Sequence, residues 1–306
     1  DCTSLQSVVI PDSVTEIGYL AFRGCSSLKS IVIPDSVINI SSSAFENCIN
    51  LEHLIVANGT LIYASPTIAT GDYTIPDSVT KIGKFAFEGC TSLQSVVIPE
   101  GVTEIGDSAF RGCSSLKKVV IPDSVTEIGY EAFRFCSSLK SIVIPDSVIN
   151  IFSSAFKNCI NLEHLIVANG ALIYASPTIA TGDYTIPDSV TKIGRFAFED
   201  CTSLQSVVIP DSVTKIGVLA FKDCTSLQSV VIPEGVTEIG YGAFIGCSSL
   251  KKVVIKNPDI YLDEDCFADC ENLDEVTLPK GLTKARVKKY FKRSPWAEAK
   301  DKGGKK

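Results

Sequence analysis

Cysteine is the residue type in this chain whose number and spacing most directly suggest chemistry. Eleven of the twelve cysteines recur in phase, at intervals of 23 or 42 residues. Zinc needs four converging ligands, and the sequence contains no Cys-x-x-Cys pair. Equivalent cysteines of stacked units would project in parallel, which suits disulfides poorly. We therefore expect no metal and no cofactor, but a column of buried free thiols, each a small apolar side chain with a weak hydrogen bond. The periodic cysteines are Cys2, Cys25, Cys48, Cys90, Cys113, Cys136, Cys159, Cys201, Cys224, Cys247 and Cys270.

Histidine offers no catalytic pair. The two histidines, His53 and His164, are copies of one repeat position. The adjacent Glu52 and Glu163 would point to the opposite side of a strand, so they cannot act with the histidines. The sequence also lacks G-x-S-x-G, G-x-x-x-x-G-K-S/T, H-E-x-x-H and G-x-G-x-x-G motifs. We predict no enzymatic activity and no catalytic residue, with the histidines making surface polar contacts.

The units between the cysteines share one apolar pattern, of which the copy CSSLKKVVIPDSVTEIGYEAFRF is typical. Alternation in the V-x-I segment predicts a short strand, which the following proline ends because it has no N–H to donate. In the first unit this alternation would point Val8 and Ile10 inward and Val9 outward. So small a unit cannot bury its own apolar face, whereas stacked units bury a shared one. The pattern predicts a repeat solenoid.

Three further repeat positions have predicted structural roles. Gly18 and its equivalents are expected to permit a bend before an Ala-Phe turn. The carboxylates of the I-P-D-S-V and I-P-E-G-V segments are interpreted as structural turn residues, because they recur in most units. One phenylalanine per unit is expected to stack in an interior aromatic column. This column comprises Phe22, Phe45, Phe87, Phe110, Phe133, Phe156, Phe198, Phe221, Phe244 and Phe267.

A longer repeat is superimposed on the short one. Residues 1–111 and 112–222 match at most positions, and a third, partial block follows. Each full block contains one 42-residue unit, in which Asn58-Gly59 (and its copy) separates two apolar runs and predicts a hairpin. Counting strand positions gives about 13 coils. We expect one continuous solenoid over residues 1–279.

Residues 280–306 form a basic cap and tail. They hold 11 Lys/Arg and two acids, so the chain's net charge of −7 leaves −16 on the preceding residues. Val287, Tyr290 and Phe291 fall on one face of an amphipathic helix. We expect this helix to cover the open end of the core, with Trp296 packed beneath it. The alternative is a patch for anionic surfaces or nucleic acid.

The outward strand positions are the candidate binding surface. One column is mostly valine, and the neighbouring column is mostly serine, with lysine and histidine at some positions. High β-propensity alone accounts for exposed valines, whereas a long exposed apolar strip is typical of an interaction site. Both interpretations stay open at this point. The candidate ligand-binding residues are Val97, Lys118, Val120, Ser141, Val143, His164, Ile166, Ser206 and Val208.

The repeat resembles the BspA-like, or TpLRR, class of leucine-rich repeats. The matching elements are L-x-x-I-x-I-P, V-T-x-I-G, A-F and the terminal Cys, over about 90% of the chain. The resemblance implies a curved right-handed coil with a concave parallel β-sheet, short helical or 3-10 turns and a C-terminal capping helix. It also implies a secreted or cell-surface protein, and some members of the class bind extracellular-matrix proteins.

Together these features predict an adhesin-like scaffold that binds host, matrix or cell-surface proteins through its concave face. The alternative is a structural spacer or stalk that displays another domain, which the block duplication favours. The acidic balance argues against nucleic acid as a partner, and no apolar run is long enough to span a membrane. We expect a monomer that can associate end to end through its uncapped N-terminal coil.

Overall fold

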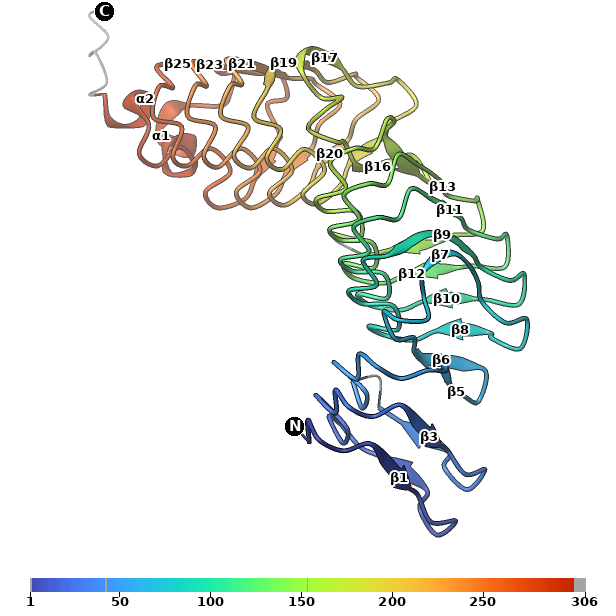
Figure 1. Ribbon diagram of the computed structural model, residues 1–306. Helices are drawn as coiled ribbons and strands as arrows, with labels where there is room; N and C mark the ends of the chain where they lie inside the picture. The colour runs from blue at the N-terminus through green and yellow to red at the C-terminus, as the bar shows by residue number, and fades with distance from the viewer. Residues whose placement is uncertain (1, 42, 153, 300–306) are drawn as a thin grey trace, which may run out of the picture. The chain divides into compact units, whose positions relative to one another are not determined.

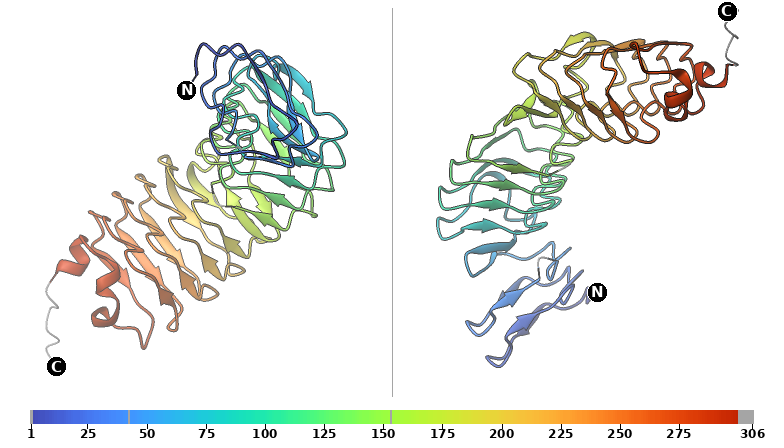
Figure 2. Two further views of the ribbon diagram at one scale, coloured as in Figure 1. Left: turned by 90° about the horizontal axis from the view of Figure 1, so that it is seen from below. Right: turned by 180° about the vertical axis from the view of Figure 1, so that it is seen from behind.

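The computed structural model describes residues 2–41, 43–152 and 154–299. The chain forms two compact units, Asp1–Leu162 and Glu163–Lys306. Each unit is a parallel β-solenoid of stacked coils (Figures 1 and 2), and the two together make about 12 turns. The basic tail from residue 300 onward lies outside the described residues. That the whole of 1–279 is one continuous solenoid remains a prediction.

Each regular coil contributes one long strand and one strand of two residues. The alternating pattern of the sequence explains the long strand, and the I-P segment ends it. In the first unit the long strands are β1 (Ser7–Val9), β3 (Ser30–Val32), β7 (Gly71–Thr74), β9 (Leu93–Val97), β11 (Lys118–Val120) and β13 (Ser141–Val143). The short strands are β2 (Glu16–Ile17), β4 (Asn39–Ile40), β8 (Lys81–Ile82), β10 (Glu104–Ile105), β12 (Glu127–Ile128) and β14 (Asn150–Ile151).

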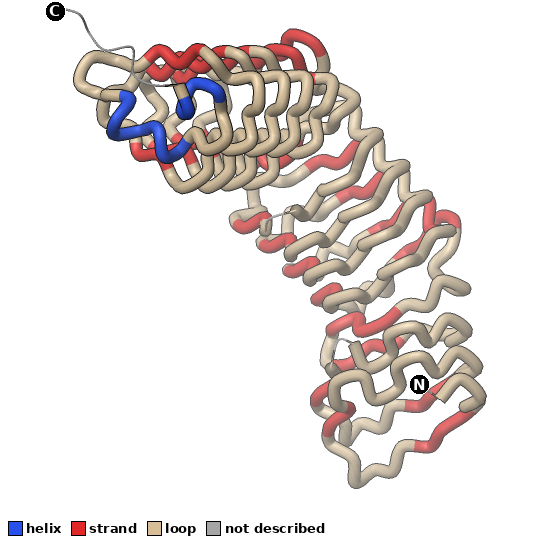
Figure 3. Tube along the Cα trace, turned by 90° about the vertical axis from the view of Figure 1, so that its left-hand side faces the viewer, coloured by secondary structure: helices blue, strands red, loops and turns tan. Residues whose placement is uncertain are grey.

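The second unit repeats this arrangement. Its long strands are β17 (Gly182–Thr185), β19 (Leu204–Val208), β21 (Ser229–Ile232), β23 (Lys252–Ile255) and β25 (Glu275–Thr277). Its short strands are β18 (Lys192–Ile193), β20 (Lys215–Ile216), β22 (Glu238–Ile239) and β24 (Tyr261–Leu262). In both units each strand pairs in parallel with the equivalent strand of the neighbouring coil, so equivalent residues lie side by side. The long strands line one side of the coils and the short strands another, and the helices of the described residues lie at the C-terminal end (Figure 3).

The predicted interior aromatic column is confirmed, in segments. Within the first unit the rings of Phe110 and Phe133 stack with centroids 5.2 Å apart, and those of Phe133 and Phe156 stack at 5.5 Å. The stack is interrupted at the 42-residue spacer, whose shortened coil has no phenylalanine at this phase. There the edge of Tyr73 contacts Phe87 instead, at 6.0 Å. The column therefore unites the coils of each unit through aromatic contacts.

The predicted column of buried free thiols is also confirmed. All twelve cysteines are free, and all except Cys2 are buried. The thiol of Cys136 donates to the backbone oxygen of Phe110 in the preceding coil at 3.1 Å, and other coils repeat this bond. Each thiol thus satisfies a carbonyl at the coil junction while filling a small apolar space.

The repeat glycine has a different role from the one predicted. Gly129 does not adopt a positive φ, so no left-handed bend requires it. A Cβ at this position would lie 2.5 Å from the backbone nitrogen of Asp107 and 2.6 Å from the carbonyl carbon of Gly106. Glycine is needed at Gly129 because adjacent coils approach too closely for a side chain. At Gly18, in the first coil, a Cβ would meet nothing within 4 Å, so this requirement applies only where a coil precedes.

The predicted hairpins are confirmed, and they reduce the number of regular coils. β5 (Ile55–Ala57) pairs antiparallel with β6 (Thr60–Tyr63), and Asn58 and Gly59 between them have φ of 49° and 73°. Two positive φ values suit the tight turn that Asn-Gly favours. β15 (Ile166–Ala168) and β16 (Ala171–Tyr174) form the second hairpin. Two of the 13 expected outward strands are therefore hairpin strands that join the short-strand sheets.

The C-terminal cap is present, although its helix is broken into short pieces. They are α1 (Lys284–Val287), a 3-10 turn η1 (Lys288–Tyr290) and α2 (Pro295–Glu298). Phe291 is fully buried and stacks on Phe267 at 4.6 Å, which continues the phenylalanine column, and Trp296 lies 5.0 Å from Phe291. Lys292 pairs with Asp265 at 2.6 Å, so acids of the last coil offset part of the basic charge. No helix among the described residues is long and apolar enough to cross a membrane.

Candidate protein-binding surface

The strand face, as we name the outward side of the long strands, carries two parallel rows in the first unit. Strand register aligns Thr74, Val97, Val120 and Val143 in one row. The three valines expose 56%, 58% and 73% of their surface, as predicted for an outward column. Between them the inward side chains, such as Val119, are buried. Burial of the inward set fixes which side chains face outward, because strand side chains alternate with period two.

The neighbouring row on these strands is polar. It aligns Asp72, Ser95, Lys118 and Ser141. Lys118 and Ser141 are exposed, as predicted. At one end of this row the Ser95 hydroxyl donates to the Asp72 carboxylate at 2.6 Å. The carboxylate keeps its negative charge and stays exposed. The strand face of the first unit therefore combines an apolar row with a polar row that offers one free cation among the described residues.

The second unit carries the same two rows. Val208, which is 56% exposed, aligns with Thr185, and Val231 is also exposed. Ser206 is half-buried and donates to the carboxylate of Asp183 at 2.5 Å. At the far end of the sheet, Lys252 and Glu275 form an ion pair at 2.6 Å. The repeat thus builds one kind of surface in each unit.

One of the candidate residues departs from the predicted outward orientation. Ile166 is 1% exposed, so its placement on the outward surface is wrong. It pairs with Tyr174 in the hairpin, and the register shifts between Ile166 and Val167. A shift of one residue turns a side chain to the other face of a strand, which buries Ile166 in the core. His164 is half-buried, as Ser206 is.

A third row of side chains borders the strand face, and the sequence analysis assigned it no binding role. Nearly every regular coil carries an exposed Asp or Glu immediately after the proline that follows the long strand. The sequence signal was present, because this carboxylate lies three residues after each outward valine. We call it the carboxylate row. It comprises Asp12, Asp35, Asp77, Glu100, Asp123 and Asp146 in the first unit and Asp188, Asp211 and Glu234 in the second.

The buried thiols in the interior of the coils are poor nucleophiles. Burial raises the pKa of Cys136 well above the ordinary value for a thiol, and neighbouring Cys159 raises it further. The thiol, not the nucleophilic thiolate, is therefore the form present at neutral pH. Among the described residues no group of three or more His, Cys, Asp or Glu side chains is arranged to hold a metal ion. The exposed rows are the surfaces that can act on a partner.

Stacked coils, long strands in register and buried Leu, Phe and Cys columns define a leucine-rich-repeat solenoid. The family described as BspA type Leucine rich repeat region matches this chain in six copies, over residues 1–67, 67–176 and 174–295. The chain therefore belongs to the family of BspA-type leucine-rich-repeat proteins, as the repeat motif predicted. In general, the repeats of this family serve as protein-interaction scaffolds.

Solved structures agree with this assignment. A leucine rich cell surface protein from Faecalibacterium prausnitzii is 32% identical, with a TM-score of 0.58 over 94% of this chain and 82% of that chain. A leucine-rich repeat protein from Eubacterium ventriosum is 23% identical, with a TM-score of 0.54 over 99% of this chain and 86% of that chain, and it shares the fold. Comparison with curated proteins gives no match.

Proposed function

We propose that this protein is a non-enzymatic scaffold at the cell surface, or secreted, that binds other proteins through the strand face. The observation that carries the proposal is the exposed valine row, which strand pairing holds in register across neighbouring coils. The similarity to a protein described as a cell surface protein supports the location. Host or matrix proteins are the partners we propose to test, and the scaffold acts as a monomer.

The valine row suits protein binding for a simple energetic reason. Each exposed valine that a partner covers contributes roughly 1 kcal/mol through removal of apolar surface from water. Strand pairing on both sides already fixes the backbone beneath these valines. Binding therefore costs little further conformational entropy. A flat, rigid strip with an apolar row and polar margins resembles the general anatomy of protein interfaces.

Removal of two central valines should weaken this binding. We expect Val120→Ser with Val143→Ser to weaken a partner's affinity at least tenfold, because about 1 kcal/mol is lost at each site. The measurement is a binding screen of the purified chain and this variant against a panel of matrix and cell-surface proteins. Serine already occupies the neighbouring outward positions Ser95 and Ser141, so the fold should persist, and circular dichroism checks it. Equal affinity of the two proteins for a captured partner would remove the strand face as the site.

A spacer is the second candidate function, because the near-identical blocks 1–111 and 112–222 lengthen the array without changing its surface. Deletion of residues 112–222 joins two coils in phase, so we expect the shortened chain to fold with an unchanged circular dichroism spectrum per residue. If the chain binds through its valine row, its affinity for a captured partner should fall, because the row becomes shorter by Val120, Val143 and Val208. Full affinity after the deletion would favour the spacer.

A further inference from the structure

The carboxylate row is exposed and uncompensated. Asp77, Glu100, Asp123 and Asp146 occupy equivalent turns of coils that stack in register, and none forms an ion pair or hydrogen bond with another described residue. Glu104, on a short strand of the same coils, does meet a base. Lys81 pairs with Glu104 at 3.1 Å in the short-strand sheet. The carboxylate row is a surface where like charges follow one another without such partners.

The turn does not need these carboxylates. In the coil that contains Asp123, the backbone N–H of Val125 donates to the oxygen of Pro122 at 3.1 Å and closes the turn. The hydroxyl of Ser124 donates to the oxygen of Val102 in the preceding coil at 2.7 Å. Asp123 lies in this turn, as predicted, but the bonds that close the turn come from Val125 and Ser124 and not from the carboxylate. Its charge is left available to a partner.

The like charges of the carboxylate row repel one another. Parallel strands lie about 4.8 Å apart, so neighbouring coils bring like charges close enough to repel even in water. A cationic partner that lies along the row removes this repulsion and gains attraction at each coil. The 279 residues before the cap carry a net charge of −16, which adds a long-range attraction for such a partner.

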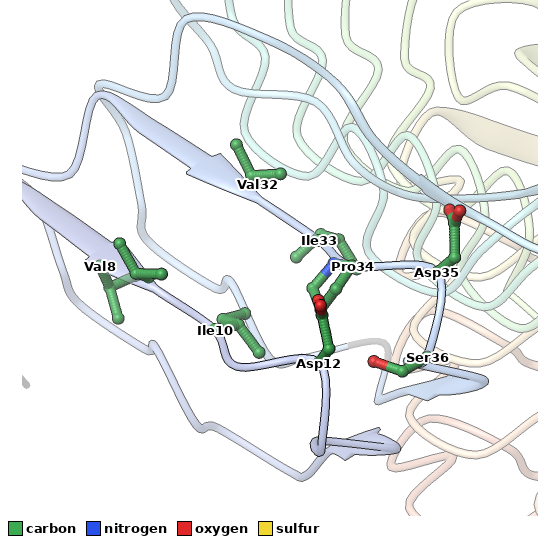
Figure 4. Close-up of a pocket in the computed structure, with 9 residues that line it drawn as sticks. Val8, Ile10, Asp12, Val32, Ile33, Pro34, Asp35 and Ser36 are labelled. Atoms are coloured by element: carbon green, nitrogen blue, oxygen red, sulfur yellow. The ribbon is translucent and has the colours of Figure 1, made fainter.

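A hollow in the first two coils shows how valines and carboxylates combine (Figure 4). It is lined by Val9 and Val32 of the strand face, by Pro34, and by Asp12 and Asp35 of the carboxylate row. The two carboxylates come from equivalent turns of neighbouring coils. The lining offers an apolar wall and a negative rim. A lysine or arginine side chain has the matching construction, because its aliphatic stem is apolar and its head is charged.

We infer that the strand face binds a lysine- or arginine-rich segment of a protein partner, whose stems lie over the exposed valines and whose cationic heads lie at the carboxylate row. The inference rests on the proposed function and specifies the chemistry of the partner. Each coil supplies one such subsite, for example Val120 with Asp123. Affinity therefore grows with the number of basic residues and falls with added salt.

The test measures binding of the full chain to a fluorescent peptide of alternating lysine and serine. A peptide of the same length with glutamate in place of lysine is the control. Binding is measured by anisotropy at low and high salt. One variant neutralises the row, with Glu100→Gln, Asp123→Asn and Asp146→Asn. The control variant removes the same charge from the short strands, with Glu16→Gln, Glu104→Gln and Glu127→Gln.

We expect the lysine peptide to bind at low salt and the glutamate peptide not to bind. The row variant should bind the lysine peptide about tenfold more weakly, since each exposed pair contributes a modest part of the total. The control variant should change affinity less than twofold. Equal weakening in both variants, or no binding of the lysine peptide, overturns the inference. A partner lost by Val120→Ser with Val143→Ser but retained by the row variant would overturn the inference and leave the proposed function intact.

Discussion

Raising the pH from 8 to about 10.5 is expected to unfold this protein. Burial raises the pKa of nine cysteines above the ordinary 9.0, for example to about 12 at Cys48, Cys90 and Cys270. The other six are Cys113, Cys136, Cys159, Cys201, Cys247 and Cys266. Because the folded state holds these protons more tightly than the unfolded chain, their stabilisation is complete below pH 9 and is lost as the pH rises toward the folded values. Each thiol then loses up to about 1.4 kcal/mol per pH unit, so by about pH 10 the nine together lose an amount comparable with the typical total stability of a domain.

The measurement is the free energy of unfolding in urea at pH 7, 9 and 10, followed by circular dichroism. The matched variant, Cys136→Ala with Cys159→Ala, removes two of the buried thiols. Between pH 9 and 10 its stability should fall by about 2 kcal/mol less than that of the unchanged chain. A thiol reagent at pH 8 should modify only the exposed Cys2 until the chain unfolds. Undiminished stability at pH 10, or rapid labelling of many thiols in the folded protein, would contradict a buried column.

Replacement of a central phenylalanine should destabilise the first unit strongly. Phe133 is fully buried and stacks between Phe110 at 5.2 Å and Phe156 at 5.5 Å. Phe133→Ala leaves a cavity and removes both stacking contacts, so we expect a loss of about 3–5 kcal/mol. In thermal unfolding this corresponds to a midpoint lower by about 10 °C. The effect should concentrate in the coils around residue 133, because solenoid coils interact mainly with their neighbours.

Phe135 provides the control for this substitution. It lies two residues further along the chain, is exposed, and has a φ of 62°, a conformation that favours Asn over Phe. Its equivalents Asn47 and Asn158 adopt the same conformation. Phe135→Asn forfeits only a contact with Arg134, whose guanidinium lies 4.5 Å from the ring, so the change should stay within about 1 kcal/mol. A similar loss of stability in Phe133→Ala and Phe135→Asn would mean that stacking in the phenylalanine column does not stabilise the coils as expected.

The repeat made most of the fold predictable from sequence. Apolar phase alone identified the inward Val119, the stacked Phe133 and the thiol of Cys136, because every coil must present the same side chains to its neighbours. The Asn-Gly pairs predicted both hairpins, since that dipeptide adopts positive φ with little strain. Exposure of Val97, Val120 and Val143 followed from alternation along the strand.

Three features could not be obtained from the pattern. Ile166 is buried because a register shift in its hairpin turns the side chain, and such a shift has no sequence signature here. The role of Gly129 depends on how closely the backbones of adjacent coils approach, which only coordinates show. Asp123 recurs like a structural residue, and the hydrogen bonds of Ser124 and Val125 were needed to show that the turn does not use it.

The central claim is that the strand face binds a protein partner through its valine row. The most direct measurement compares the dissociation constants of the unchanged chain and the Val120→Ser, Val143→Ser variant for the partner that the screen captures. The account predicts at least a tenfold weaker complex for a variant that remains folded and retains its thermal midpoint within a few degrees. Identical dissociation constants would contradict it and would assign recognition to another surface of the coils.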